Sequence, residues 1–198
     1  KILGWFQGRS EFGQRALGAR SILGDPRHND HRIKINEQVK QREWWRPLAP
    51  SVLDECAGDW FEGLSNDQNA SPYMSLTATI LDTKISDVPA VAHVDNTARL
   101  QTVRQCDSPL YHRLIAAFYA KTGIPMVLNT SFNGKGQPIV ETPQEALRAF
   151  LSFRGHMDAL FLGDWMITRR GFPLQGMESA AAVAPTLTVA AEMYYRSE

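Results

Sequence analysis

The sequence of 198 residues has few cysteines, no long apolar run and no net charge, and each shortage excludes a class of protein. Its two cysteines, Cys56 and Cys106, are far apart and form no CxxC pair, which argues against a disulfide scaffold or a zinc site. No apolar stretch approaches the roughly 20 residues that a membrane helix requires, and no signal-peptide pattern opens the chain. We therefore expect a soluble, cytoplasmic protein with no membrane partner.

The formal net charge is zero, because 21 Lys and Arg balance 21 Asp and Glu. A neutral chain has no general attraction for nucleic acid, and we expect no nucleic-acid partner. The charge is nevertheless unevenly placed: residues 1–50 hold ten Lys or Arg against five Asp or Glu, whereas residues 51–90 hold one against seven. The positive charge is therefore concentrated in the part of the chain that carries the glycine-rich segment.

Several catalytic signatures are also missing. No GxSxG, HExxH, GxxxxGK[ST] or GxGxxG pattern occurs, and neither cysteine has a histidine nearby, which disfavours covalent catalysis. His28 and His31 are three residues apart, but no third and fourth ligand are suitably spaced, so we predict no metal site in this chain.

The composition that remains is that of a globular domain, with 43% hydrophobic residues, 14 Gly and 11 Pro. A folded chain of this size buries about 70% of its unfolded surface, so it can form a core without disulfides. The sequence begins at Lys1 rather than Met and enters a strand-like run at once. We expect the chain to be a fragment of a longer protein.

The first half of the chain predicts several strands and one helix. Ile2–Phe6 is typical of a buried strand, and Asp25 followed by Pro26 predicts a helix that runs to about Lys40. Residues 44–52 contain two prolines and predict irregular structure or an edge strand, and residues 58–69 form an acidic loop. The segments 75–81 and 97–103 are the next two expected strands.

The second half predicts strands that alternate with helices. One helix begins at Pro109 and ends at Gly123, a strand follows over 124–128, and Thr142 opens a capping box. The closing strands are expected at 159–162 and 165–168, whereas the segment after residue 170 is ambiguous. This order predicts an α/β fold, a sheet packed by helices.

Residues 8–21, with the sequence GRSEFGQRALGARS, combine glycines with arginines. Glycine lets backbone N–H groups approach an anion, and Arg15 and Arg20 can offer forked donors to phosphate oxygens. A glycine-rich turn with solvated arginines has the same composition, so the residues alone leave both interpretations open.

A second cationic group consists of Lys40, Arg42 and Arg46 beside Trp44 and Trp45. The two prolines that follow stiffen the backbone, and the arrangement suits an anion held under an aromatic lid. The alternative is a solvated helix end whose cations lie near its negative pole.

A third group, Asn129, Ser131 and Asn133, follows the strand expected to end at Leu128. A polar loop at the carboxyl end of a strand is where open α/β folds bind ligands, and these side chains offer neutral donors to sugar or phosphate oxygens. An Asx-type turn leading to Gly134 is the alternative.

A smaller group lies around the start of the strand expected over 97–103, with a histidine and an aspartate before the strand and an arginine within it. These residues are His93, Asp95 and Arg99. A loop with local ion pairing is the simpler interpretation.

Five segments in this order resemble the C-terminal domain of the NodU/CmcH-type O-carbamoyltransferases. They are GWFQGRSEFGQRALGARSIL at 4–23, RPLAPSVL at 46–53, SPYM at 71–74, TARLQTV at 97–103 and LNTSFN at 128–133. The resemblance covers about residues 2–168, and one departure is Gln14, where the family pattern has Pro. That change could loosen the turn without removing Arg15.

The resemblance implies a YrdC-like domain over residues 1–170, a twisted open mixed sheet flanked by helices with a concave basic cleft, followed by an extension over 171–198. Such a domain uses ATP to activate carbamoyl phosphate as carbamoyl adenylate. An N-terminal actin/hexokinase-like domain with a histidine-bound metal then transfers the carbamoyl group to a hydroxyl of a natural product or sugar. This chain would perform or support the first half-reaction.

By the same resemblance, the Lys40-x-Arg42 and Ser131-x-Asn133 pairs would hold the nucleotide, and Mg²⁺ would arrive with ATP. Two sets of residues follow. The expected catalytic residues are Arg15, Lys40 and Arg99, and the expected substrate- or nucleotide-binding residues are Arg20, Arg42, Arg46, Asn129, Ser131 and Asn133.

A second interpretation keeps the fold and the binding of ATP but not the reaction. In that case the chain is a nucleotide-binding module with no turnover unless the N-terminal domain is present. Release of pyrophosphate from ATP and carbamoyl phosphate separates the two interpretations.

Overall fold

The computed structural model describes residues 1–64 and 70–169 of the chain. The expected extension over 171–198 lies outside these ranges. Within them, no helix combines the length and the apolar character that crossing a membrane demands.

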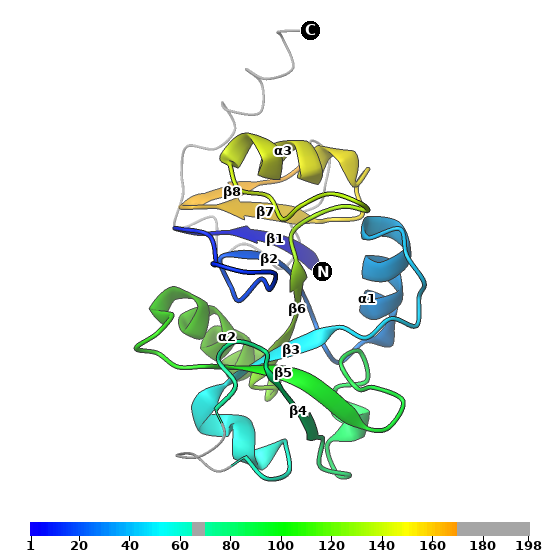
Figure 1. Ribbon diagram of the computed structural model, residues 1–198, viewed down its shortest axis with the longest axis vertical. Helices are drawn as coiled ribbons and strands as arrows, with labels where there is room; N and C mark the ends of the chain where they lie inside the picture. The colour runs from blue at the N-terminus through cyan, green and yellow to red at the C-terminus, as the bar shows by residue number, and fades with distance from the viewer. Residues whose placement is uncertain (65–69, 170–198) are drawn as a thin grey trace, which may run out of the picture.

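The centre of the structure is one mixed, eight-stranded open sheet with the order β4-β5-β3-β6-β2-β1-β7-β8 (Figure 1). The strands are β1 (Ile2–Phe6), β2 (Arg20–Gly24), β3 (Ala49–Leu53), β4 (Leu76–Thr79), β5 (Thr97–Val103), β6 (Met126–Ser131), β7 (Ala159–Leu162) and β8 (Trp165–Ile167). The sheet twists strongly, so β4 and β8 at its edges run in different directions (Figure 1). The α/β fold with an open mixed sheet confirms the expectation from the sequence.

The helices cover both faces of this sheet. They are α1 (Asn29–Lys34), which continues as the π-helical segment η1 (Ile35–Val39), the 3₁₀ helices η2 (Asp54–Asp59) and η3 (Ile85–Asp87), α2 (Pro109–Thr122) and α3 (Pro143–Ser152). As the sequence predicted, α2 ends at Gly123 in a left-handed conformation. The capping box of Thr142 and Glu145 opens α3.

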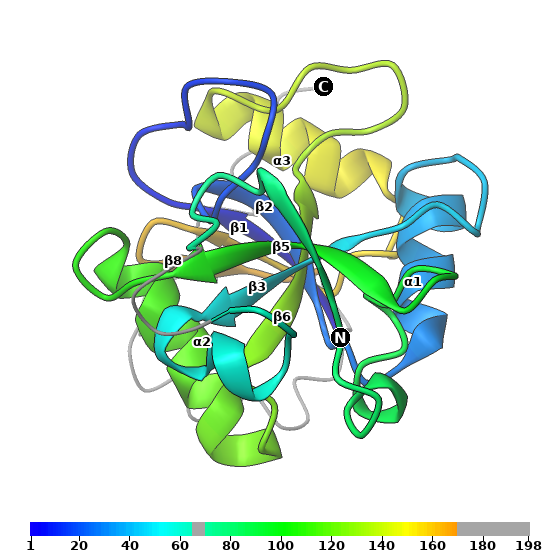
Figure 2. The ribbon, with the colours of Figure 1, turned by 60° about the horizontal axis from the view of Figure 1, so that its bottom comes forward.

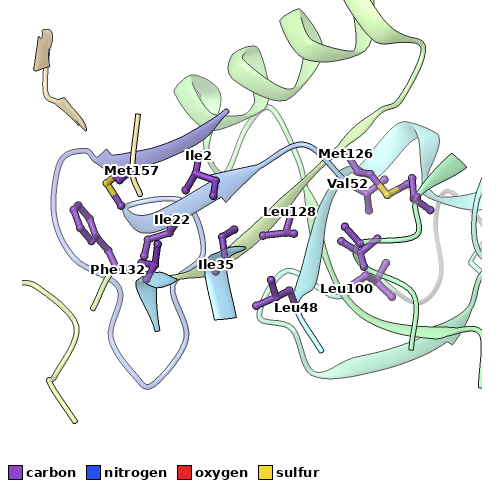
Figure 3. Close-up of a cluster of buried hydrophobic side chains, with 14 of the residues drawn as sticks. Ile2, Ile22, Ile35, Leu48, Val52, Leu100, Met126, Leu128, Phe132 and Met157 are labelled. Carbon is purple, nitrogen blue, oxygen red and sulfur yellow. The ribbon is translucent and has the colours of Figure 1, made fainter. Parts of the chain in front are cut away.

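Successive side chains of each strand point to opposite faces of the sheet, so the buried hydrophobic side chains form two clusters, one on each face. The larger cluster includes Ile22 and Leu128 of neighbouring strands, Ile35 of η1 and Phe150 of α3. Figure 3 shows Ile22, Leu128 and Ile35 directed toward one another. Each fully buried side chain of this kind contributes about 1.5–3 kcal/mol, so η1 and α3 are fixed to this face by their apolar residues.

The smaller cluster lies on the opposite face, where α2 packs with Tyr111 and Ile115 against Leu23 and Val127. Figure 2 shows α2 lying across the strands, on the far side of the sheet from α1. Helix α2 covers only part of this face. The remaining part carries polar residues and forms the candidate site.

One expected helix boundary is wrong. The helix predicted to begin at Asp25 and Pro26 begins at Asn29 instead, with His28 at the N-cap position. Asp25 is engaged locally, because its Oδ1 accepts a hydrogen bond from the Arg27 backbone N–H at 3.0 Å. An Asp side chain that binds its own backbone two residues on stabilises a turn in place of a helix.

The prediction for residues 44–52 is confirmed over 44–48, which are irregular, and is wrong over 49–52. Strand β3 is neither irregular nor at an edge: it lies between β5 and β6, and all five of its residues are buried. Pro50 is tolerated because the β3–β5 pairing begins one residue later, at Ser51. The missing N–H of Pro50 therefore falls just outside that ladder.

Candidate functional site

The part of the α2 side of the sheet that helix α2 itself does not cover is lined by Ser51 of β3, Arg99 and Gln101 of β5, and Asn129 and Ser131 of β6. We call this surface the polar face. Ser51 Oγ donates to Gln101 Oε1 at 2.7 Å and Asn129 Nδ2 donates to Ser51 Oγ at 3.0 Å, so these three side chains share a side. Residues two apart in a strand point the same way, which adds Arg99 and Ser131 to that side.

The inner part of the polar face holds the glycine loop, which we define as residues 8–19. Asn129 Nδ2 donates to the Ala16 carbonyl at 3.0 Å, and Gln101 Nε2 donates to the Leu17 carbonyl at 2.8 Å. These bonds fix the residues directly after Arg15 on top of the sheet. Buried amides bound in this way stabilise one conformation of the loop.

The glycine loop is also held from its own side. The Leu17 and Ala19 N–H groups donate to Glu11 Oε1 at 2.6 and 2.7 Å, and Trp5 Nε1 donates to the Gly18 carbonyl at 2.8 Å. Sequence reasoning missed Glu11 and Gln101 as supports of the site. The signal was present in the family-like segments that contain them, but only the fold reveals their partners.

Arg20 has a different role from the expected one. It is 3% exposed, and its guanidinium donates to the carbonyls of Gln7, Ala19, Gly8 and Glu141 at 3.1 to 3.4 Å. Its guanidinium carbon also lies 3.5 Å from the centre of the Phe6 ring. With its terminal nitrogens bound to carbonyls, Arg20 fixes the start of the glycine loop and is not a phosphate ligand in this arrangement.

Asn129 is likewise a supporting residue. The strand expected to end at Leu128 continues to Ser131, so Asn129 lies inside β6 and is 1% exposed. Its amide nitrogen is used by Ala16 and Ser51, as described above. Asn129 thus positions the glycine loop through Nδ2, whereas its Oδ1 is buried with no hydrogen-bond partner among the described residues, and its assignment to ligand binding stays a prediction.

Lys40, Ser131 and Asn133, in contrast, converge as the sequence predicted. Lys40 Nζ donates to the Ser131 carbonyl, to Ser131 Oγ at 3.1 Å, to the Asn133 carbonyl at 3.1 Å and to Asn133 Oδ1 at 2.6 Å. The three residues come from the end of η1 and from the carboxyl end of β6. An ammonium with three N–H groups thus has four oxygen acceptors, none of them a carboxylate.

The surroundings of Lys40 favour the neutral form of its side chain and so lower its pKa. Burial and, to a smaller extent, the positive charge of Arg42 together lower the pKa of Lys40 from 10.5 to about 7. A neighbouring anion would restore the charged form. Lys40 is therefore suited to respond to a phosphate.

Arg42 and Arg46 lie beside Lys40, although each already has a protein partner. Arg42 Nε donates to Asn36 Oδ1 at 2.8 Å, and burial followed by the charge of Arg46 lowers the Arg42 pKa. Arg46 forms a surface ion pair with Glu43 at 2.8 Å and is half exposed. The buried Asn36 amide thus fixes the orientation of Arg42, whereas Arg46 lies on the surface.

Arg15 and Arg99 form the second cationic group. Burial lowers the pKa of Arg99, and the positive charge of Arg15 lowers it further, so the two guanidiniums are close enough to repel each other. Arg99 Nε is buried and has no hydrogen-bond partner among the described residues. Two like charges beside an unused donor indicate an anion site.

The two cationic groups lie on the same face at a separation set by the sheet. Strands β5 and β6 are separated by β3 alone, and neighbouring strands are about 4.8 Å apart. The backbones that carry Arg99 and Ser131 are therefore about 10 Å apart across the strands. This distance lets two linked anionic groups contact both sets.

One hollow near the site lies apart from the cations of both groups. It has a volume of about 400 Å³ and lies between the glycine loop and the segment 138–141, with Asn133 at one side. Glu11 and Glu141 line it, whereas none of the expected cations does. Because carboxylates repel phosphates, we do not assign the nucleotide to this hollow.

In residues 1–64 and 70–169, no cluster of His, Cys, Asp or Glu has the makeup of a metal site.

Comparisons with known proteins identify the family to which the chain belongs. A family model described as "Carbamoyltransferase C-terminus" matches residues 1–169. Nodulation protein NolO of Bradyrhizobium diazoefficiens is 43% identical over 184 residues, which are 93% of this chain and 33% of that protein. The 3'-hydroxymethylcephem-O-carbamoyltransferase of Amycolatopsis lactamdurans is 36% identical over 165 residues, 83% of this chain and 30% of that protein.

Nodulation protein NolNO of Sinorhizobium fredii adds a third match, 46% identical over 169 residues, which are 85% of this chain and 24% of that protein. The chain thus spans about a third or less of the length of these relatives. Its match to the family model extends through every strand and helix described above. The chain belongs to the carbamoyltransferase C-terminus family.

Proposed function

We propose that this chain binds ATP and carbamoyl phosphate on the polar face and activates the carbamoyl group as carbamoyl adenylate. The observation that carries this proposal is the convergence of Lys40 with Ser131 and Asn133, together with the pairing of Arg15 and Arg99 on the same face. In this assignment the Lys40 end holds the nucleotide phosphates. The Arg15 and Arg99 end holds carbamoyl phosphate.

Electrostatics explain why both cationic groups are needed. ATP and carbamoyl phosphate are both anions, and two unit charges 4 Å apart repel by about 4 kcal/mol at an effective dielectric constant of 20. Fixed cations on the polar face offset that repulsion. Arg42, held by Asn36, contributes without having to be reoriented.

Carbamoyl phosphate is first hydrolysed to carbamate and phosphate. A carbamate oxygen then attacks the α-phosphorus of ATP and the bond to the β-phosphate oxygen breaks, so carbamoyl adenylate and pyrophosphate form. Lys40 exchanges one of its four oxygen partners for a phosphate oxygen and is charged in that contact. Negative charge that builds up on the departing pyrophosphate is stabilised by Lys40 and Arg42.

Mg²⁺ bound to the ATP phosphates would supply further charge neutralisation. Its ligands would be phosphate oxygens and water. No described residue cluster is required for it.

The second half of the reaction belongs to a different part of the protein in this proposal. The O-carbamoyltransferase of Amycolatopsis lactamdurans is named for transfer to a hydroxymethyl group, and this chain corresponds to 30% of it. We propose that an N-terminal domain accepts the adenylate and transfers the carbamoyl group to a hydroxyl of a natural product or sugar.

A nucleotide-binding module without turnover remains the second candidate. It is favoured by one observation: Lys40, Ser131 and Asn133 already satisfy one another, so binding alone could be their role. Both candidates require ATP to bind at Lys40. They differ only in whether pyrophosphate is released.

The test is pyrophosphate release from ATP, measured with and without carbamoyl phosphate. We expect release that depends on carbamoyl phosphate in the wild type and at least a tenfold loss in Lys40→Met and Arg99→Gln, since a bond to a charged group contributes about 1.5–3 kcal/mol. Arg104→Gln is the matched control, because Arg104 is half exposed and paired with Asp107 away from the polar face.

Calorimetric titration with ATP completes the test. Normal ATP affinity without any pyrophosphate release would favour the binding module. Equal ATP affinity in the wild type and Lys40→Met would contradict both candidates, because both assign the phosphates to Lys40.

A further inference from the structure

His93 lies in a tight turn before β5, on the same side of the sheet as Arg99. Its N–H donates to the Thr97 carbonyl at 2.8 Å, and Asn96, with a φ of 62°, closes the turn. Thr97 is two residues before Arg99 in β5, so both side chains point to the polar face.

A chain of hydrogen bonds fixes which nitrogen of His93 carries its proton. Thr97 Oγ1 donates to Asp95 Oδ1 at 2.7 Å, and His93 Nδ1 lies 3.0 Å from the same Thr97 Oγ1. A hydroxyl has one proton, which Asp95 already accepts, so Nδ1 must be the donor to Thr97. In the neutral ring, Nε2 therefore carries a lone pair, and it has no hydrogen-bond partner among the described residues.

Two arginines act on this imidazole. Burial lowers the pKa of His93, the charges of Arg99 and Arg32 lower it further, and Asp95 raises it. Arg32 is positioned from α1 by a hydrogen bond to the Ala92 carbonyl at 3.3 Å. The Nε atoms of Arg32 and Arg99 are both buried and unpartnered within the described residues.

We propose that Arg32 and His93 extend the Arg15–Arg99 group into a site for a phosphoryl dianion, in which His93 binds as the imidazolium and donates from Nε2. The proposal rests on the proposed function, because it assigns the dianion to carbamoyl phosphate. A dianion beside Arg99 and Arg32 offsets the charges that keep the ring neutral, so binding takes up one proton. The sequence singled out His93, Asp95 and Arg99 as a small group, with local ion pairing as the simpler interpretation, but it did not connect His93, Asp95, Arg32 or Thr97 with the expected site.

Sulfate is the first probe, because it stays a dianion over the whole range in which histidine titrates. Calorimetry on the 198-residue chain should give sulfate binding that weakens about tenfold from about pH 6 to about pH 8. Two substitutions separate the ring nitrogens: His93→Asn keeps a donor for Thr97 and removes Nε2, whereas His93→Gln places a neutral donor near Nε2.

The proposal expects His93→Asn to bind sulfate about tenfold more weakly at low pH and without pH dependence. His93→Gln should bind with intermediate, pH-independent affinity, and Arg32→Gln should bind more weakly at both pH values. If the affinity of His93→Asn for sulfate kept its full pH dependence, the proposal would be overturned. The group that takes up the proton would then be another one, such as Lys40.

A stable carbamoyl phosphate analogue, phosphonoacetamide, and a non-hydrolysable ATP analogue distinguish the source of the phosphoryl group. Phosphonoacetamide should raise the His93 pKa in an NMR titration of the ring protons, with His93→Asn identifying the signal. A rise caused by the ATP analogue alone would overturn the assignment to carbamoyl phosphate.

Failure of this inference and failure of the proposed function have different signatures. If Arg99→Gln loses phosphonoacetamide while His93→Asn and Arg32→Gln bind it normally, the inference fails and the proposed function stands. If the wild type binds neither phosphonoacetamide nor sulfate, the proposed function fails with it.

Discussion

Lys40 illustrates how a single residue links stability to binding in this fold. Its ammonium has four oxygen acceptors but no carboxylate, and it lies in a buried position beside Arg42. The sequence could predict Lys40, Ser131 and Asn133 as a group because their family-like spacing survives in the chain. It could not predict that they would bond to one another, because that contact joins residues about ninety positions apart.

The low pKa of Lys40 predicts a rise in stability with pH. The unfolded chain holds this proton up to the ordinary value of 10.5, whereas the folded protein releases it near 7. Between these values the unfolded state binds more protons, so the free energy of unfolding rises by up to about 1.4 kcal/mol per pH unit. Urea unfolding at several pH values above 7 should show this slope in the wild type and a smaller slope in Lys40→Met; equal slopes would contradict the assignment.

Gly18 is the residue at which the glycine loop most clearly requires glycine. Its φ is +109°, and a Cβ there would overlap the Tyr111 ring. We expect Gly18→Ala to lower the free energy of unfolding by about 3 kcal/mol, from backbone strain and overpacking together.

Gly13→Ala is the matched control, because Gly13 also has a positive φ, +128°, but open space around it. We expect it to show only the cost of strain, about 1 kcal/mol. Equal losses in the two variants, measured by urea unfolding, would mean that the Tyr111 contact does not restrict the loop.

At the scale of elements, the sheet decides which polar residues support the site and which are available to a ligand. The pattern of apolar and polar residues predicted the strands that are bounded by glycine or polar turns, such as β1 and β5. The prediction was wrong for β3, because Pro47 and Pro50 indicated irregular structure or an edge strand. It also ended β6 too early, because Asn129 is a poor strand former in isolation and is retained by its buried hydrogen bonds.

Gln101 connects β5 to the glycine loop, so we expect Gln101→Met to lower both the stability of the protein and its affinity for one of the two ligands. This change keeps the side-chain volume but leaves the Leu17 carbonyl and Ser51 without their partner, at about 1–3 kcal/mol of stability. We also expect weaker binding of phosphonoacetamide, because Arg15 is part of the glycine loop and is displaced when the loop moves. Binding of an ATP analogue at Lys40 should be normal. Calorimetry with both ligands checks this; an equal loss for both would argue for a general disturbance of the fold.

The capping box of α3 gives a prediction independent of the site. Thr142 accepts the Glu145 N–H while Glu145 accepts the Thr142 N–H at 3.0 Å. Thr142→Ala should therefore lower the free energy of unfolding by about 1 kcal/mol, whereas Thr142→Ser, which keeps the hydroxyl, should have little effect. Chemical unfolding of both variants measures the difference, and equal stability of the two would show that the cap contributes nothing.

On the scale of the whole molecule, helices cover one face of the open mixed sheet and part of the other, and among the described residues the polar face occupies the area that α2 leaves. The Lys40 and Arg99 groups lie on it about 10 Å apart across the strands, as expected for one extended anionic ligand or two adjoining ones. Under the proposed function, this arrangement brings the two mutually repelling anionic substrates together. It also leaves the acidic hollow beside Glu11 and Glu141 outside the reaction.

The most direct test of this central claim is a crystal structure of the chain soaked with a non-hydrolysable ATP analogue and phosphonoacetamide. We predict phosphates in contact with Lys40, and the phosphonate between Arg15 and Arg99. Nucleotide bound in the hollow between Ser10 and Glu141, or phosphonate bound away from Arg99, would contradict the account.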